Sequence, residues 1–224
     1  MLEIKKELKS KIFDKIFEID EIISITIVGS FIDKDDLSGI SDIDTVVICN
    51  TLNEKIFNRC INSFKKLNLD ECGIKNYDLE INSTFGPLKF DNPNTVVLHL
   101  MIYDIKGHQN HVNKSPFTCY DWERSNDFVG LHLKEVFPVG AIQLRDFKEA
   151  RRSTENYLAD LKNNTISFRK YEFNENKVMQ VKKNMRMNSK HKGEYAYHIA
   201  KNLISNYIKF CFNTNQLISK SEIN

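Results

Sequence analysis

The segment that decides the fold runs from Ile22 to Cys49, IISITIVGSFIDKDDLSGISDIDTVVIC, and holds two apolar stretches separated by a polar one. Ile22–Val28 is short and rich in β-branched residues, which predicts a buried strand. Gly29-Ser30 interrupts this stretch, and the polar residues that follow predict a loop. Ile43–Cys49 is again apolar and predicts a second strand. The segment therefore predicts two buried strands joined by a glycine turn and a loop.

Two carboxylates, Asp42 and Asp44, stand at the start of the second strand. Side chains two positions apart on a strand project from the same face, so the two acids repel each other unless water or a cation neutralises them. Oxygen-only sites of this kind suit Mg²⁺ or Mn²⁺. Asp78 and Glu80 share the polar face of a later predicted strand, 77–82, and are candidates for a further metal ligand.

Gly29 and Ser30 stand directly after the first strand, thirteen residues before Asp42. A glycine lets the backbone approach a phosphate closely, and the serine hydroxyl and neighbouring N–H groups can donate to it. Together with the acids, the turn predicts a site for a metal-bound triphosphate.

The rest of the chain predicts further elements around this centre. A 3.6-residue apolar period predicts a helix over 2–18, and Thr51 is a candidate cap for a helix through Leu67. A strand is predicted over 95–103, and 105–127 is predicted to be irregular. Helices are then predicted over 145–161, 174–187 and 194–212. This order favours an α+β or α/β sheet domain over residues 1–144, followed by a helical domain over residues 145–224.

Composition excludes several classes of protein. The chain has 224 residues, of which 41% are hydrophobic and 28% charged, as in a folded globular protein. No apolar run approaches the roughly 18 residues of a membrane span, and the N-terminus lacks the apolar stretch of a signal peptide. The five cysteines form no CxxC pair, which disfavours a disulfide framework or a zinc knuckle. We therefore expect a cytoplasmic protein that is not bound to a membrane.

The charges are unevenly distributed along the chain. Residues 1–144 carry 16 Lys and Arg against 22 Asp and Glu, whereas residues 145–192 carry 13 against 6. An acidic half suggests cations and a basic half suggests phosphates, although solvated faces that happen to differ would give the same count. The basic run consists of Lys177, Lys182, Lys183, Arg186, Lys190 and Lys192. No RNA-binding motif accompanies it, so specific nucleic-acid binding is not indicated.

Val28-Gly29-Ser30, then eleven residues, then Asp42-Ile43-Asp44 resembles the signature of the DNA polymerase β-like nucleotidyltransferase superfamily. That signature is an apolar residue, Gly, then Gly or Ser, a spacer, and acid-apolar-acid. Its members include poly(A) polymerases, CCA-adding enzymes, aminoglycoside nucleotidyltransferases and small adenylyltransferases. The resemblance covers about residues 25–81, and Thr45 departs from it where an apolar residue is usual.

The resemblance implies an α+β fold and a metal-dependent transfer of NMP from an NTP, such as ATP, with release of pyrophosphate. It implies that Gly29 and Ser30 hold the triphosphate and that Asp42 and Asp44 bind Mg²⁺ or Mn²⁺. It also implies a third acid, for which Asp78 is preferred because it directly follows an apolar residue at the start of its strand.

Several alternatives stay open on the sequence. In one of them, Glu80 rather than Asp78 is the third acid. In another, Lys201 weakly resembles a lysine that several nucleotidyltransferases acting on small molecules direct to the triphosphate. His108 and His111 fit a polar loop better than a metal pair, and His99, inside an apolar strand, fits a core or site-facing position better than a ligand. The acceptor is open: a sugar, an antibiotic, a lipid precursor, a protein hydroxyl or an RNA end all fit.

Two functions of other classes also remain. A nucleotidyltransferase fold without catalysis would bind nucleotide or a partner protein, and a helical interaction module would use the sheet only as scaffold. The sequence does not set the oligomeric state. Dependence of NTP binding on Mg²⁺, Asp42 and Asp44 separates these possibilities from an enzyme.

Overall fold

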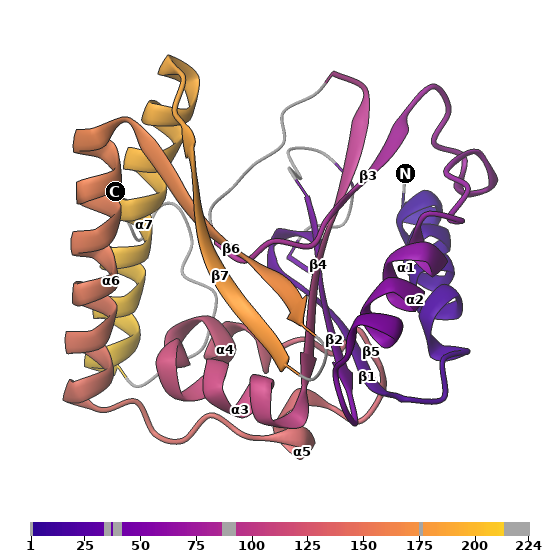
Figure 1. Ribbon diagram of the computed structural model, residues 1–224, viewed down its shortest axis with the longest axis horizontal. Coiled ribbons are helices and arrows are strands. Elements are labelled where there is room, and N and C mark those ends of the chain that lie inside the picture. Colours follow the sequence, from indigo (N-terminus) through magenta and orange to yellow (C-terminus); the bar gives the residue numbers. More distant parts are fainter. Residues whose placement is uncertain (1, 34–36, 38–41, 87–92, 175–176, 213–224) are drawn as a thin grey trace.

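The computed structural model describes residues 2–33, 37, 42–86, 93–174 and 177–212 (Figure 1). In chain order the elements are α1 (Leu2–Phe17), β1 (Ile22–Val28), the 3-10 turn η1 (Gly29–Phe31), β2 (Ile43–Cys49), α2 (Glu54–Phe64), the 3-10 turn η2 (Asp70–Cys72), β3 (Asp78–Asn82), β4 (Thr95–Asp104), α3 (Ile105–Lys114), α4 (Pro116–Trp122), β5 (Phe128–Gly130), α5 (Leu133–Val136), α6 (Leu144–Asn163), β6 (Thr165–Asn174), β7 (Lys177–Arg186) and α7 (Ser189–Phe212). In the described part of the chain, no helix is both long and apolar enough to cross a membrane.

Five strands form one mixed sheet in the order β3-β4-β2-β1-β5. β2, β4 and β3 run parallel to one another, and β1 runs antiparallel to both β2 and β5. The prediction of an α+β protein is confirmed, and the sheet is mixed and flanked by helices. β1 and β2 are also confirmed, with the bounds that their apolar runs predict.

One face of the sheet is covered by α1 and α2, which lie side by side in Figure 1. Leu8, Ile12 and Ile16 recur every four residues along α1, so they share one helix face, and all three are fully buried. The alternate residues of the strands, among them Ile25 and Val47, meet them from the sheet. α2 begins two residues later than predicted, because Asn53 rather than Thr51 caps it. The Asn53 side chain accepts a hydrogen bond from the Ile56 N–H at 3.0 Å.

The opposite face of the sheet packs against the segment after β4. Met101 and Tyr103 of β4 form a second core with Val112 of α3 and Trp122 of α4. The prediction of an irregular segment over 105–127 is therefore wrong. α3 escapes a periodicity search because its buried positions include His108, a polar residue type.

The C-terminal half contains a β-hairpin, which corrects the prediction of a purely helical domain. The segment predicted as a helix over 174–187 is instead mostly β7, paired antiparallel with β6 from Thr165↔Arg186 to Asn174↔Lys177. Its Lys, Gln and Met residues favour a helix locally, but the hydrogen bonds of the distant β6 decide the outcome. α6 and α7 are helices as predicted.

Tyr171 of β6 connects this hairpin to the main sheet. Its hydroxyl donates a hydrogen bond to the Ile102 carbonyl of β4 at 2.8 Å, and its ring packs against both sheet cores. β3 pairs only with Thr95–His99 of β4, and Tyr171 contacts β4 beyond that part, at Ile102. On the far side, the hairpin packs against α6 and α7 through Ile166, Tyr195 and Ile199.

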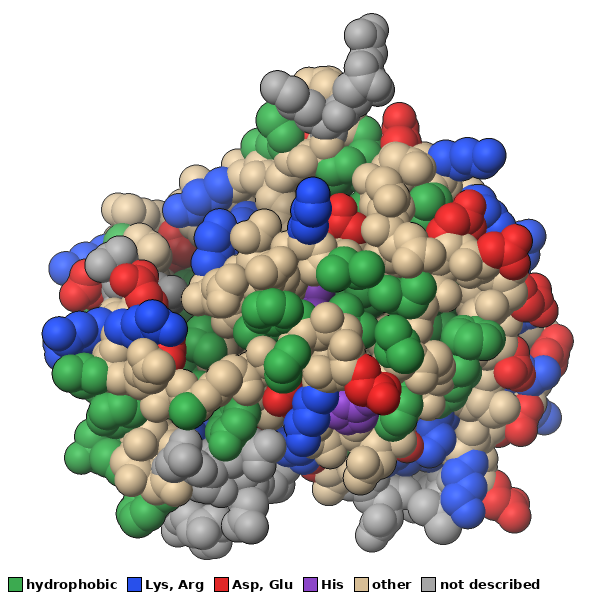
Figure 2. Space-filling model, turned by 90° about the horizontal axis from the view of Figure 1, so that it is seen from below, with side chains coloured by type: hydrophobic (Ala, Val, Ile, Leu, Met, Phe, Trp, Pro, Cys, Tyr) green, Lys and Arg blue, Asp and Glu red, His purple; other side chains and the backbone are tan. Residues whose placement is uncertain are grey.

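The uneven charge of the sequence is visible on the surface. Figure 2 shows the molecule from below, with many acidic side chains on the right, where α1 and α2 lie, and many basic ones on the left, where α6 and α7 lie. α1 and α2 cover the face of the sheet opposite to Asp44, because Asp44 alternates along β2 with Ile43, which belongs to their core. The acidic surface is therefore separate from the paired acids of the motif.

The buried His111 in the second core is expected to make the stability of the protein sensitive to acid. Its ring is stacked between Tyr103 and Trp122, with centroid distances of 5.3 and 5.0 Å. Burial and the positive charge of Arg169 lower the pKa of His111 to about 3. The unfolded chain takes up this proton near pH 6.5 and the folded chain does not, so stability falls as the pH drops below that value, by up to about 1.4 kcal/mol per pH unit.

We expect His111→Phe, which keeps the stacked ring, to reduce this loss. Urea unfolding at pH 6.5 and pH 4.5 measures the loss of stability between these two values. His191→Phe is the control, because His191 is a half-buried residue of α7. An equal acid sensitivity of His111→Phe and wild type would show that His111 is not the group responsible.

Candidate metal site

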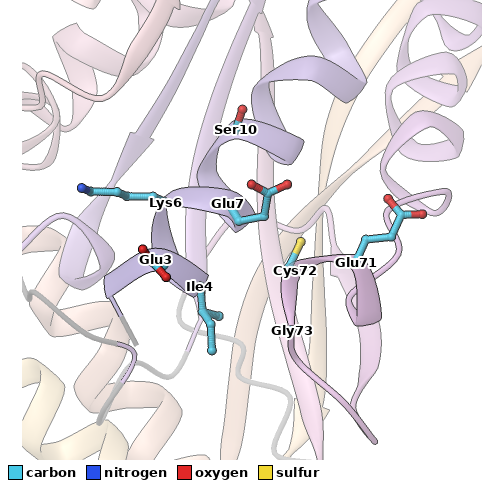
Figure 3. A pocket seen from close by; sticks show the side chains of 8 residues that line it. All are labelled: Glu3, Ile4, Lys6, Glu7, Ser10, Glu71, Cys72 and Gly73. Carbon is cyan, nitrogen blue, oxygen red and sulfur yellow. The ribbon is translucent and has the colours of Figure 1, made fainter.

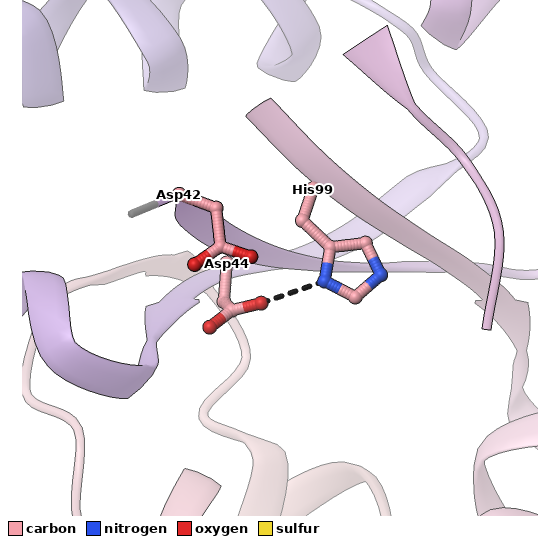
Figure 4. Close-up of side chains that lie close together, drawn as sticks. All are labelled: Asp42, Asp44 and His99. Carbon is pink, nitrogen blue, oxygen red and sulfur yellow. Dashed lines mark hydrogen bonds and ion pairs between the residues drawn. The ribbon is translucent and has the colours of Figure 1, made fainter. Parts of the chain in front are cut away.

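Three side chains that can hold a metal ion meet on the sheet face away from α1 and α2 (Figure 4). Asp42 directly precedes β2, Asp44 is its second residue, and His99 lies in the middle of β4. One ligand atom from each lies within 4.8 Å of the others, and this is the one group of three or more His, Cys, Asp or Glu side chains so placed in the described residues. The two acids are half-buried, and His99 is only 9% exposed.

The register of the sheet explains why these residues meet. Asp44 pairs with Val28 of β1 on one side and with His99 of β4 on the other, and His99 pairs in turn with Asn82 of β3. Asp44, His99 and Asn82 therefore form one row across three neighbouring strands. Opposite residues of a sheet have Cβ atoms about 5 Å apart, which places the carboxylate and the imidazole in contact.

Both ring nitrogens of His99 make hydrogen bonds. Nδ1 lies 2.7 Å from Asp44 Oδ1, and Nε2 lies 2.8 Å from the Thr84 carbonyl oxygen. Burial lowers the pKa of His99, but the hydrogen bond and charge of Asp44 outweigh burial, so the pKa of His99 is raised above its ordinary value. The imidazole thereby neutralises part of the negative charge that the acid pair concentrates here.

A second layer of contacts holds the Thr84 carbonyl in place. The Asn82 side-chain oxygen accepts hydrogen bonds from the Thr84 N–H at 3.0 Å and from the Thr84 hydroxyl at 2.7 Å. The next residue, Phe85, exchanges two backbone hydrogen bonds with Arg169 of β6, at 2.7 and 2.8 Å. The C-terminal hairpin thus fixes the segment that orients His99.

The Gly-Ser turn lies directly against the acids. Gly29 begins η1 with φ +73°, a conformation that side chains disfavour, and a Cβ at this position would collide with Asp44 Oδ2. A larger residue at this position would be strained by the positive φ and would push the Asp44 carboxylate aside. The backbone of the turn and the Asp44 carboxylate therefore share one site, with Ser30 next along the chain.

Arg124 supports the other end of this turn. Its guanidinium donates to Asp33 Oδ1 at 2.6 Å, and Asp33 follows η1 by two residues. The neighbouring Ser125 hydroxyl donates to the Ile27 carbonyl of β1, also at 2.6 Å. The end of α4 is therefore fastened to both sides of the Gly29-Ser30 turn.

Neither of the two third-acid candidates belongs to the group of three ligand atoms that lie within 4.8 Å of one another. Asp78 is exposed at the start of β3, four residues before the Asn82 that stands in the row of His99 and Asp44. At about 3.3 Å per strand residue, this is about 13 Å along the sheet. Glu80 is half-buried between these two positions. His99, rather than Asp78 or Glu80, completes the group around Asp42 and Asp44.

The basic side chains that the sequence singled out lie in the C-terminal half. Lys182 and Arg186 are exposed on β7, and Lys201 is exposed on α7. Lys183 pairs with Glu172 of β6 at 2.8 Å. The sequence predicts that these residues lie on two helices, whereas the structure places them on the strand β7 and the helix α7. Any contact with a triphosphate would therefore come from β7 as well as from α7.

A pocket on the other side of the molecule does not include this site. It lies between the start of α1 and η2 (Figure 3). Its lining residues are Glu3, Ile4, Lys6, Glu7, Ser10, Glu71, Cys72 and Gly73. Because α1 covers the opposite face of the sheet, this pocket is separate from Asp42, Asp44 and His99.

Comparison with known proteins does not place the chain in a family. No protein-family model matches it, and no curated protein or solved structure does so either. The function is therefore inferred from the Gly29-Ser30 and Asp42-Ile43-Asp44 motif and from the contacts around it.

Proposed function

We propose that the protein is a metal-dependent nucleotidyltransferase that transfers NMP from an NTP to a hydroxyl acceptor and releases pyrophosphate. The observation that supports this most strongly is the contact between the Gly29 backbone and the Asp44 carboxylate. A glycine turn and an acid pair are each common alone. Their direct contact joins a phosphate-binding element to a metal-binding element in one site.

The side chains fit a divalent metal, because two carboxylates and an imidazole offer three donor atoms within 4.8 Å of one another. A bound divalent ion would neutralise triphosphate charge and favour ionisation of the acceptor hydroxyl. Asp42 and Asp44 would hold it, and His99 would stand beside them. The Gly29-Ser30 turn would bind the phosphates through its N–H groups and the Ser30 hydroxyl.

In the reaction, the acceptor oxygen forms a bond to the α-phosphorus while the bond from that phosphorus to the α,β-bridging oxygen breaks. Pyrophosphate leaves with the bonding electrons, and the hydroxyl proton passes to a base or to solvent. The turn contributes by orienting the phosphates in line with the acceptor.

Ser30 provides a graded test of the phosphate-binding role. We expect Ser30→Ala to weaken NTP binding by about 1.5–3 kcal/mol, because a hydrogen bond to a charged phosphate is lost. Titration calorimetry with NTP and Mn²⁺ measures this change. Ser10→Ala on α1, which lines the pocket of Figure 3, is the control and should have no effect. Unchanged affinity in Ser30→Ala would indicate that the hydroxyl does not contact the phosphates.

Isotope transfer tests the reaction itself. The protein is incubated with Mn²⁺, pooled sugars, antibiotics, proteins and RNA ends, and ATP labelled at either the α- or the γ-phosphorus. Label from the α-position should enter an acceptor, and label from the γ-position should appear in pyrophosphate. Transfer of the γ-label to an acceptor would instead indicate a kinase, and binding without any transfer would indicate a fold that binds nucleotide without catalysis.

A further inference from the structure

The group formed by Asp42, Asp44 and His99 offers a nitrogen atom as well as carboxylate oxygens. We propose that His99 Nδ1 is a metal ligand alongside Asp42 and Asp44, and that the site selects a divalent first-row transition-metal ion over Mg²⁺. The role of this ion in catalysis rests on the proposed function, but its coordination is a property of the protein alone.

The hydrogen bond to Thr84 determines which nitrogen is available. A carbonyl oxygen only accepts, so the 2.8 Å contact requires a proton on Nε2. In the neutral ring the lone pair is then on Nδ1, the nitrogen that faces the acids in Figure 4. A metal ion would bind the Nδ1 lone pair in place of the proton that Nδ1 shares with Asp44 Oδ1. The Asp44 carboxylate would turn outward from its 2.7 Å contact to face the ion, and the proton would leave to solvent.

The surroundings of His99 are those of an oriented ligand. Histidines that bind metals commonly donate their other N–H to a carbonyl or carboxylate, which fixes the ring orientation. Here the Thr84 carbonyl accepts that hydrogen, and the Asn82 side chain holds Thr84 through two hydrogen bonds. His99 is 9% exposed and Asn82 is 2% exposed, so water competes little with these contacts.

The donor set favours some ions over others. Mg²⁺ prefers oxygen ligands and gives up its water reluctantly, whereas imidazole suits the transition metals. For mixed nitrogen and oxygen ligands, affinity rises from Mn²⁺ through Fe²⁺ to Co²⁺. We therefore expect Co²⁺ to bind more tightly than Mn²⁺, and both more tightly than Mg²⁺.

The experiment uses the full chain and Mn²⁺ alone, without nucleotide. Pulsed electron paramagnetic resonance of bound Mn²⁺ detects a directly coordinated nitrogen, and labelling the histidines with ¹⁵N identifies it as imidazole. We expect nitrogen coupling in the wild type that changes with the label. The coupling should persist in the matched control His198→Gln on α7 and vanish in His99→Asp. His99→Asp should also reduce the preference for Mn²⁺ over Mg²⁺ by at least about tenfold.

The outcomes separate this inference from the proposed function. Mn²⁺ that requires Asp42 and Asp44 but shows no nitrogen coupling would overturn the inference and leave nucleotidyl transfer intact. Nitrogen-coordinated Mn²⁺ in a protein that binds no NTP would support the inference and overturn the function. If His99→Asp does not fold, nitrogen coupling in the labelled wild type that is lost on Asp42→Asn with Asp44→Asn still assigns the ligand, because His99 is the histidine grouped with both acids in the described residues.

Discussion

Gly29→Ala is expected to lose most of the metal affinity of the protein while remaining folded. An alanine Cβ would collide with Asp44 Oδ2, so the carboxylate must move away from Asp42 and His99. Displacing an oriented ligand in this way is expected to weaken Mn²⁺ binding about 100-fold. Titration of free Mn²⁺ by electron paramagnetic resonance measures the affinity.

Gly73→Ala is the matched control for backbone strain. Gly73 has φ +77°, close to the +73° of Gly29, but its Cβ would make only ordinary contacts with Ile4, at 3.6 Å or more. Both variants should lose about 1–2 kcal/mol of stability from the left-handed conformation. Only Gly29→Ala should lose the metal. Equal Mn²⁺ affinity in the two variants would show that the turn does not constrain Asp44.

Asp42→Asn combined with Asp44→Asn is expected to abolish Mn²⁺ binding altogether. The double variant removes both carboxylates and leaves only His99 of the three ligands. The sheet should still form, because removing two like charges also removes their repulsion. Circular dichroism checks the fold, and calorimetry with Mn²⁺ checks binding.

Asp78→Asn combined with Glu80→Gln is the control for this change, since it removes the same charge from the strand beyond β4. We expect it to bind Mn²⁺ as the wild type does. Loss of the metal in this control would restore the hypothesis of a third acid on β3. Retention of the metal by Asp42→Asn/Asp44→Asn would place the metal site elsewhere.

The central strands could be predicted because their signal is local. Ile22–Val28 and Ile43–Cys49 are apolar runs bounded by turn residues, and both strands form where these runs lie. β7 could not be predicted in this way. Its conformation depends on pairing with β6, and nothing within Lys177–Arg186 records that partner.

The same distinction applies to the candidate site. Asp42, Asp44 and the Gly29-Ser30 turn were found because their spacing lies within one segment of the chain. The sequence alone predicts only a core or site-facing position for His99. Its contact with Asp44 arises from the register of two parallel strands, between residues 55 positions apart. The only local signal was a histidine inside an otherwise apolar strand.

Arg124 was missed for a similar reason. It follows α4, and its contact with Asp33 joins segments that no spacing rule connects. For the third acid, the sequence suggests a residue that the structure does not group with Asp42 and Asp44. Asp78 fits the pattern of the sequence, but the strand between it and β2 carries His99 into the position beside Asp44.

We propose that Asp42, Asp44 and the glycine turn bind an NTP through a divalent metal ion. The most direct measurement is calorimetric binding of an NTP whose α,β-bridging oxygen is replaced by a methylene group, with Mn²⁺ or with a chelator. We predict binding by the wild type with Mn²⁺ and none with the chelator. Equal affinity in the presence and absence of the metal, or no binding in either condition, would contradict the claim.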